Sequence, residues 1–79
     1  MKKHLGIVFK EIIKSKGIKI GSMGEQVGIN TKTFYNKLET GTFTFIETLR
    51  LMEFFNMDLE DLKERIGYEP LQIKEWKNA

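Results

Sequence analysis

Residues 22–38, with the sequence SMGEQVGINTKTFYNKL, carry the pattern that decides the fold. Gly28 is expected to end one short helix, because glycine readily adopts the left-handed conformation that often follows a helix C-terminus. Asn30 is a strong N-cap residue for a second helix. In that second helix Phe34 and Leu38 stand four residues apart, which places both on one buried edge. The stretch therefore predicts two short helices joined by a tight turn.

Similar patterns on both sides predict three more helices, so the expected fold is all-α. Apolar residues at helical spacing, capping residues and glycine stops predict helices over about residues 3–16, 19–27, 31 to 38 or 39, 44–55 and 59–66. The pattern Ser22-Met23-Gly24-Glu25 is a capping box, which leaves open a later start of the second helix, at Ser22. The chain has one proline, Pro70, and no strand-like alternation precedes it.

The length of 79 residues suits one domain. We expect a compact domain over residues 1–67 and a short arm over residues 68–79, which the sequence allows to be extended or to form a short helix. The last two helices are expected to bury Ile46, Leu49, Leu51, Met52, Phe55, Leu59, Leu62 and Ile66. Phe43 and Phe45 are expected to pack beneath the loop that contains them.

Charge is distributed unevenly along the chain. Residues 1–38 hold eight lysines against two acids, a balance of +6, whereas residues 39–79 hold five basic residues against nine acids, a balance of −4. A basic half beside an acidic half indicates one face that attracts polyanions. The alternative is a set of solvated helix faces with no such role.

The composition offers little for catalysis or metal binding. The chain has no cysteine, His4 is its single histidine, and its carboxylates fall on helix faces without a catalytic arrangement. We therefore expect no enzyme, no cofactor, no metal and no small-molecule substrate. No apolar run approaches the ~18 residues of a membrane span, and residues 1–10 lack a signal-peptide cleavage site. The expected location is cytoplasmic.

The order of these motifs resembles the Cro/repressor-like (XRE-type) helix-turn-helix DNA-binding domains of phages and mobile elements. The resemblance covers about residues 5–66 and rests on Gly17-Ile18, Met23-Gly24, Val27-Gly28-Ile29-Asn30, Thr33-Phe34-Tyr35-Asn36-Lys37-Leu38 and residues 49–62. It implies a compact five-helix repressor-like domain with a central helix-turn-helix. Three positions depart from the family pattern: residues 28–38 are one residue longer, Ile20-Gly21 replaces a polar residue that often contacts phosphate, and Gly24 replaces the usual alanine.

The outer face of the helix over residues 31–38 carries the candidate DNA contacts. At 100° per residue, Lys32 and Asn36 point away from the buried edge. Lysine can donate to guanine O6 and N7, and asparagine can pair in a bidentate way with adenine. The predicted base contacts are Thr31, Lys32, Thr33 and Asn36, and the predicted DNA-backbone contacts are Gly21, Ser22, Asn30, Tyr35 and Lys37.

These features predict a sequence-specific regulator of transcription, a repressor, that binds double-stranded DNA. One small module with few phosphate contacts binds weakly, so a homodimer on two half-sites about one helical turn apart is expected. Its candidate dimerisation residues are Leu71, Ile73 and Trp76. The alternative is a protein-interaction module of the same fold, such as an anti-repressor or antitoxin-like partner, without specific DNA binding.

Overall fold

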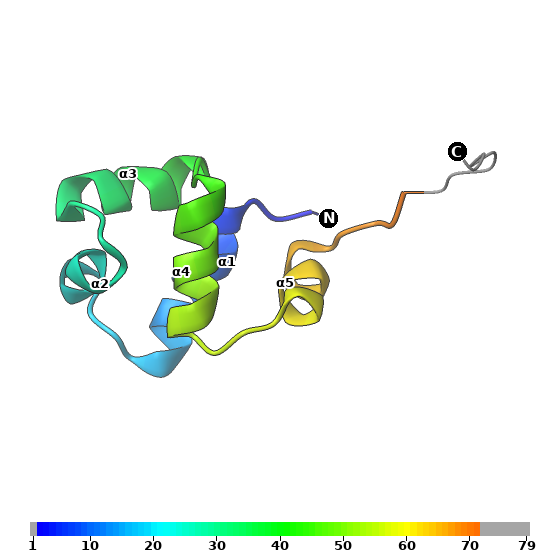
Figure 1. Ribbon diagram of the computed structural model, residues 1–79, viewed down its shortest axis with the longest axis horizontal. Helices are drawn as coiled ribbons and strands as arrows, with labels where there is room; N and C mark the ends of the chain where they lie inside the picture. The colour runs from blue at the N-terminus through cyan, green and yellow to red at the C-terminus, as the bar shows by residue number, and fades with distance from the viewer. Residues whose placement is uncertain (1, 72–79) are drawn as a thin grey trace.

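A computed structural model describes residues 2–71 of the chain and shows the expected all-α fold. The helices are α1 (Leu5–Lys16), α2 (Ile20–Val27), α3 (Thr31–Thr40), α4 (Phe45–Phe54) and α5 (Leu59–Ile66). Helix α3 packs on α1 and α2, α4 also contacts α2, and α5 packs on α1. In the view of Figure 1, α2 and α5 lie on opposite sides of α4, and α3 crosses one end of α4.

The helix ends are fixed by local capping contacts. The predicted turn glycine, Gly28, has a φ of 76°, in the left-handed region that suits glycine, and it ends α2. Asn30, Thr44 and Asp58 cap the next three helices with their side chains, as predicted. Helix α1 starts two residues later than expected, because the His4 Nδ1 atom accepts a hydrogen bond of 3.2 Å from the Ile7 N–H group.

The later start that the sequence allowed for α2 is wrong. Helix α2 begins at Ile20, and the Ser22 hydroxyl donates to the Lys19 carbonyl inside the first turn rather than capping the helix from outside. Ile20 packs against the core, and Met23 and Val27 are buried in it. These contacts favour the extra turn, since packing of an apolar edge contributes more to a short helix than propensity does.

Aromatic side chains from distant parts of the chain meet in the core. Phe9 of α1 lies edge-on to Phe43 with ring centroids 5.5 Å apart, and its ring stacks on that of Phe55 at 6.1 Å. Phe34 of α3 approaches Phe43 from another direction, at 6.1 Å. Phe43 therefore packs under the loop as predicted, and it joins α1 to α3. Edge-to-face geometry is favoured because the positive ring edge meets the negative ring face.

Helix α4 buries only part of the apolar face predicted for it, since Leu51, Met52 and the following Phe55 are buried as expected. Phe45 is 75% exposed, and Ile46 and Leu49 are also exposed, while Thr48 is buried. The Thr48 hydroxyl donates to the Thr44 carbonyl at 2.9 Å, so its polar group is satisfied and the residue can face the core. The predicted packing of Phe45, Ile46 and Leu49 is therefore wrong. The same correction applies to Leu59 of α5, which is exposed.

Candidate nucleic-acid interface

The exposed side of α3 carries the polar residues that the sequence singled out. Phe34 and Leu38 are buried, whereas Lys32, Thr33 and Asn36 are exposed. Tyr35 is half exposed on the same side. The backbone of α3 is held from behind by the core, so these side chains stand on a rigid element. Residues that read base edges need such support, because a misplaced donor loses its hydrogen bond.

The N-terminus of α3 is fixed by Asn30. The Asn30 Oδ1 atom accepts hydrogen bonds from the N–H groups of Lys32, at 3.0 Å, and Thr33, at 3.4 Å. This cap satisfies two N–H groups that the helix leaves without an internal partner. Because Oδ1 is used, the amino group of the Asn30 side chain is the part left to donate to a phosphate, the contact predicted for this residue.

Thr31 links the first turn of α3 to the first turn of α2. Its hydroxyl donates to the carbonyl of Gly21 at 3.3 Å, and the residue is half-buried. Its hydroxyl is therefore already engaged, which leaves the methyl group for the predicted base contact. The bond also brings Gly21, a predicted DNA-backbone contact, beside the start of α3. Gly21 and Ser22 are both exposed, and outside the backbone of α2 itself no atom lies within 4 Å of the position that a Cβ atom on Gly21 would occupy.

Lys37 differs from the other predicted DNA-backbone contacts. Its Nζ atom lies 2.8 Å from Glu47 Oε1 and 3.4 Å from the Thr42 carbonyl oxygen, and 18% of its side chain is exposed. A phosphate contact by Lys37 would have to compete with the Glu47 carboxylate. Lys37 thus links α3 to α4 through its ion pair with Glu47. Sequence reasoning missed this pair because Lys37 and Glu47 lie on different helices.

The Glu47 carboxylate has more than one partner. It accepts from Lys37 and also from the Thr44 N–H group, at 2.9 Å, while Thr44 Oγ1 accepts from the Glu47 N–H group at 3.1 Å. Burial raises the pKa of the Glu47 carboxyl, but the hydrogen bonds from Lys37 and Thr44 and the Lys37 charge outweigh burial and hold that pKa below its ordinary value of 4.5. Ionised Glu47 therefore stabilises the fold.

This pair predicts a pH-dependent loss of stability in a Glu47→Gln variant. Glutamine keeps an acceptor for Thr44 but no charge for Lys37, so the free energy of unfolding at pH 7 should fall by about 1–2 kcal/mol. Because the folded pKa is lowered, the contribution of Glu47 is complete above pH 4.5 and is lost as the pH falls through the folded pKa. Urea unfolding at pH 7 and pH 3.5 should show the difference from wild type shrinking at the lower pH.

The matched control for that measurement is Glu39→Gln. Glu39 is also paired with a lysine, but its side chain is 69% exposed, and exposed pairs contribute only about 0–1 kcal/mol. The expected change at pH 7 is correspondingly small. Equal losses from the two variants would contradict the special role of Glu47.

A second ion pair between helices involves the exposed side of α3. Glu39 lies one turn beyond Asn36, and Lys10 of α1 binds it, with Nζ 3.2 Å from Glu39 Oε2. A carboxylate on this surface would repel phosphate, and the lysine charge offsets it. Sequence reasoning missed this pair because its members lie 29 residues apart and neither carries a local signal.

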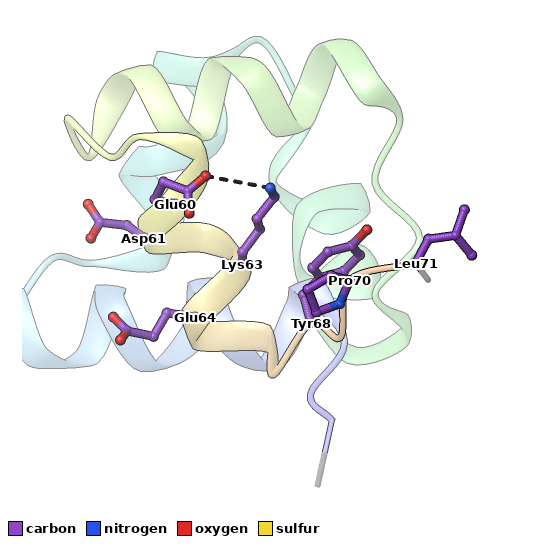
Figure 2. A pocket seen from close by; sticks show the side chains of 7 residues that line it. All are labelled: Glu60, Asp61, Lys63, Glu64, Tyr68, Pro70 and Leu71. Atoms are coloured by element: carbon purple, nitrogen blue, oxygen red, sulfur yellow. Dashed lines mark hydrogen bonds and ion pairs between the residues drawn. The ribbon is translucent and has the colours of Figure 1, made fainter. Parts of the chain in front are cut away.

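A hollow on the surface lies away from these residues, between α5 and the start of the arm (Figure 2). Its lining includes Glu60, Asp61 and Glu64, with Lys63 bonded to Glu60 at 3.5 Å and placed 5.5 Å from the centre of the Tyr68 ring. Three carboxylates make it unsuited to a phosphate. Leu71 lines the same hollow and is 76% exposed, while Ile73 and Trp76, the other predicted dimerisation residues, lie outside the described residues.

No group of histidine, cysteine, aspartate or glutamate side chains within residues 2–71 is arranged to hold a metal ion. None of the described helices is long and apolar enough to cross a bilayer. Comparisons with known protein families, curated proteins and solved structures return no match for this chain.

Proposed function

We propose that this protein is a sequence-specific regulator of transcription, a repressor, that inserts α3 into the major groove of duplex DNA as a Cro/repressor-like helix-turn-helix domain does. The observation that carries the proposal is the exposed side of α3. Lys32, Thr33 and Asn36 stand free on a helix whose opposite edge is buried and whose N-terminus is capped. Such a helix can enter a groove without rearranging.

The side chains on α3 match the chemistry of base edges. Lys32 can donate to the two acceptors of guanine, and Asn36 can both donate to and accept from adenine. The methyl groups of Thr31 and Thr33 suit the thymine methyl. Tyr35 contacts a phosphate from the exposed side of α3. Further phosphate contacts come from Gly21, Ser22 and Asn30, which lie where the Thr31–Gly21 hydrogen bond joins the first turns of α2 and α3. Lys37 is not required, since Glu47 holds it.

The competing proposal is a protein-interaction module that does not read DNA. One observation favours it: Phe45 and neighbouring apolar side chains of α4 are exposed, as in surfaces that bind proteins. The basic residues of the first half favour DNA instead, because the phosphate backbone supplies most of the attraction in such complexes.

Selection from a random pool of duplexes, followed by titration across a salt series, tests the function. We expect an enriched motif with two-fold symmetry. The binding constant should fall as the salt concentration rises, because the lysines of residues 1–38 attract the phosphate backbone and bound counterions are released. Absence of binding at low salt would remove the proposal and favour the protein-interaction module.

A further inference from the structure

Three large apolar side chains share the solvent side of α4. Phe45 is 75% exposed, Ile46 54% and Leu49 44%, and Leu49 follows Ile46 by three residues and Phe45 by four, so it is a neighbour of both on the helix surface. We name these three residues the α4 patch. The opposite side of the same helix is buried through Leu51, Met52 and Thr48. Among residues 2–71, the α4 patch is therefore an uncovered apolar surface on a helix whose other side is packed.

We infer that the α4 patch is the contact between two copies of this chain, related by a two-fold axis, and that the described start of the arm, residues 68–71, is not. The inference rests on the proposed function, because two half-sites on DNA require a second copy. A two-fold axis brings the same patch of both copies together, so the surface must be compatible with itself.

Charge distinguishes the α4 patch from the other apolar surface. On α4 the exposed charged neighbours of the patch are Arg50 and Glu53, which have opposite signs. Two copies can therefore meet without net repulsion. Arg50 is in addition directed toward α2, with Nη1 3.5 Å from the Val27 carbonyl oxygen.

The hollow beside the start of the arm does not have charges of balanced sign, so two copies would repel each other there. Three carboxylates and one lysine accompany its less polar lining residues, which are Tyr68, Pro70 and Leu71. The charged residues are Glu60, Asp61, Glu64 and Lys63. A two-fold contact there would bring six carboxylates from two copies close together, and like charges in an interface oppose binding. The described part of this surface is thus a poor place for a second copy.

The size of the α4 patch sets the strength of the contact. Even an aromatic side chain covers only roughly 150–250 Å², so one phenylalanine and two aliphatic residues, all partly exposed, supply far less than the ~800 Å² per partner of a stable interface. The patch can form only the centre of a weak interface. The free protein is then largely monomeric at micromolar concentration, and two copies held on adjacent half-sites associate because DNA raises their effective concentration.

The position of the α4 patch leaves the DNA contacts free. Figure 1 shows that α4 begins beside the C-terminal end of α3, and only residues 41–44 separate the two helices. Lys32 lies near the other end of α3, about 12 Å along the helix from Thr40 at 1.5 Å per residue. A contact through the α4 patch therefore joins the two copies at one end of α3 and does not cover its outer face.

The first test compares binding to DNA with one half-site and with two inverted half-sites. Wild-type protein should bind the double site cooperatively. Leu49→Glu should weaken binding to the double site at least tenfold and leave single-site binding unchanged, because two like charges meet at the axis. Leu49→Lys should do the same, and an equal mixture of the two variants should restore cooperativity. The matched control, Leu59→Glu on α5, changes a residue that is also exposed and should have no effect.

A second test needs no DNA and so separates this inference from the proposed function. The chain has no cysteine, so Ile46→Cys and Leu49→Cys each introduce a single thiol. With oxidised glutathione as the oxidant, at least one of them should form a disulfide dimer much faster than Leu59→Cys does. Equal rates at all three positions would overturn the inference, as would cooperativity that survives Leu49→Glu but is lost on truncation after Gly67.

Discussion

Replacing Lys32 and Asn36 together by alanine is expected to weaken specific DNA binding by about 2–6 kcal/mol, since each base contact contributes about 1–3 kcal/mol. Base preference should relax at the two positions that these side chains contact. Both residues are exposed on α3 and do not belong to the hydrophobic core, so the free energy of unfolding should change by less than about 0.5 kcal/mol. Binding to a panel of single-base variants of the selected site, with urea unfolding alongside, measures both effects.

The control for that experiment is Lys16→Ala, which removes one positive charge from the exposed end of α1. It should leave the order of preferred bases intact, because a lysine outside the groove contributes only to general attraction. If the α3 variant and the α1 variant weaken all sequences equally, α3 does not read bases, and the proposed role of its outer face fails.

The second large effect is expected at Gly6, where α1 meets α3. A Cβ atom at this position would collide with the backbone carbonyl of Leu38, which cannot move without displacing α3. Gly6→Ala should therefore lower the free energy of unfolding by about 2–3 kcal/mol, the usual cost of overpacking, even after the better helix propensity of alanine. For a domain of this size that is a large share of the total, so the midpoint of urea unfolding should fall clearly.

Gly21→Ala is the matched control for Gly6→Ala. Gly21 is also a helical glycine, but nothing within 4 Å would meet its new methyl group. This variant should gain up to about 1 kcal/mol of stability from helix propensity alone. Opposite signs for the two variants would locate the close approach of α1 and α3. Stabilisation by both would mean that these helices lie farther apart than described.

Helix ends were predictable because their signals are local. Gly28, Asn30, Thr44 and Asp58 act on groups within a few residues of themselves, so their effect does not depend on the rest of the fold. The inward face of α4 was not predictable in this way. Ile46 and Leu49 fit a helical apolar pattern as well as Leu51 does, and only the placement of the neighbouring helices decides which of them is covered.

In the candidate interface, too, the features set by local sequence were predictable and those set by packing between helices were not. The outer face of α3 follows from the helical period and from the burial of Phe34 and Leu38, so its exposed residues could be named in advance. The pairs Lys10–Glu39 and Lys37–Glu47 join residues on different helices. A surface charge has no sequence periodicity that identifies its partner, so these pairs emerge only from the packed structure.

The Lys37–Glu47 pair has a consequence for how far apart two half-sites can lie. It fastens the C-terminal half of α3 to the first turn of α4, the turn that carries Phe45 and Ile46. In the proposed dimer the angle between the two copies of α3 is then set by a rigid corner in each copy. Such a dimer fits only one separation and one relative rotation of the two half-sites. It should therefore bind more weakly to sites in which a base pair is added or removed between them.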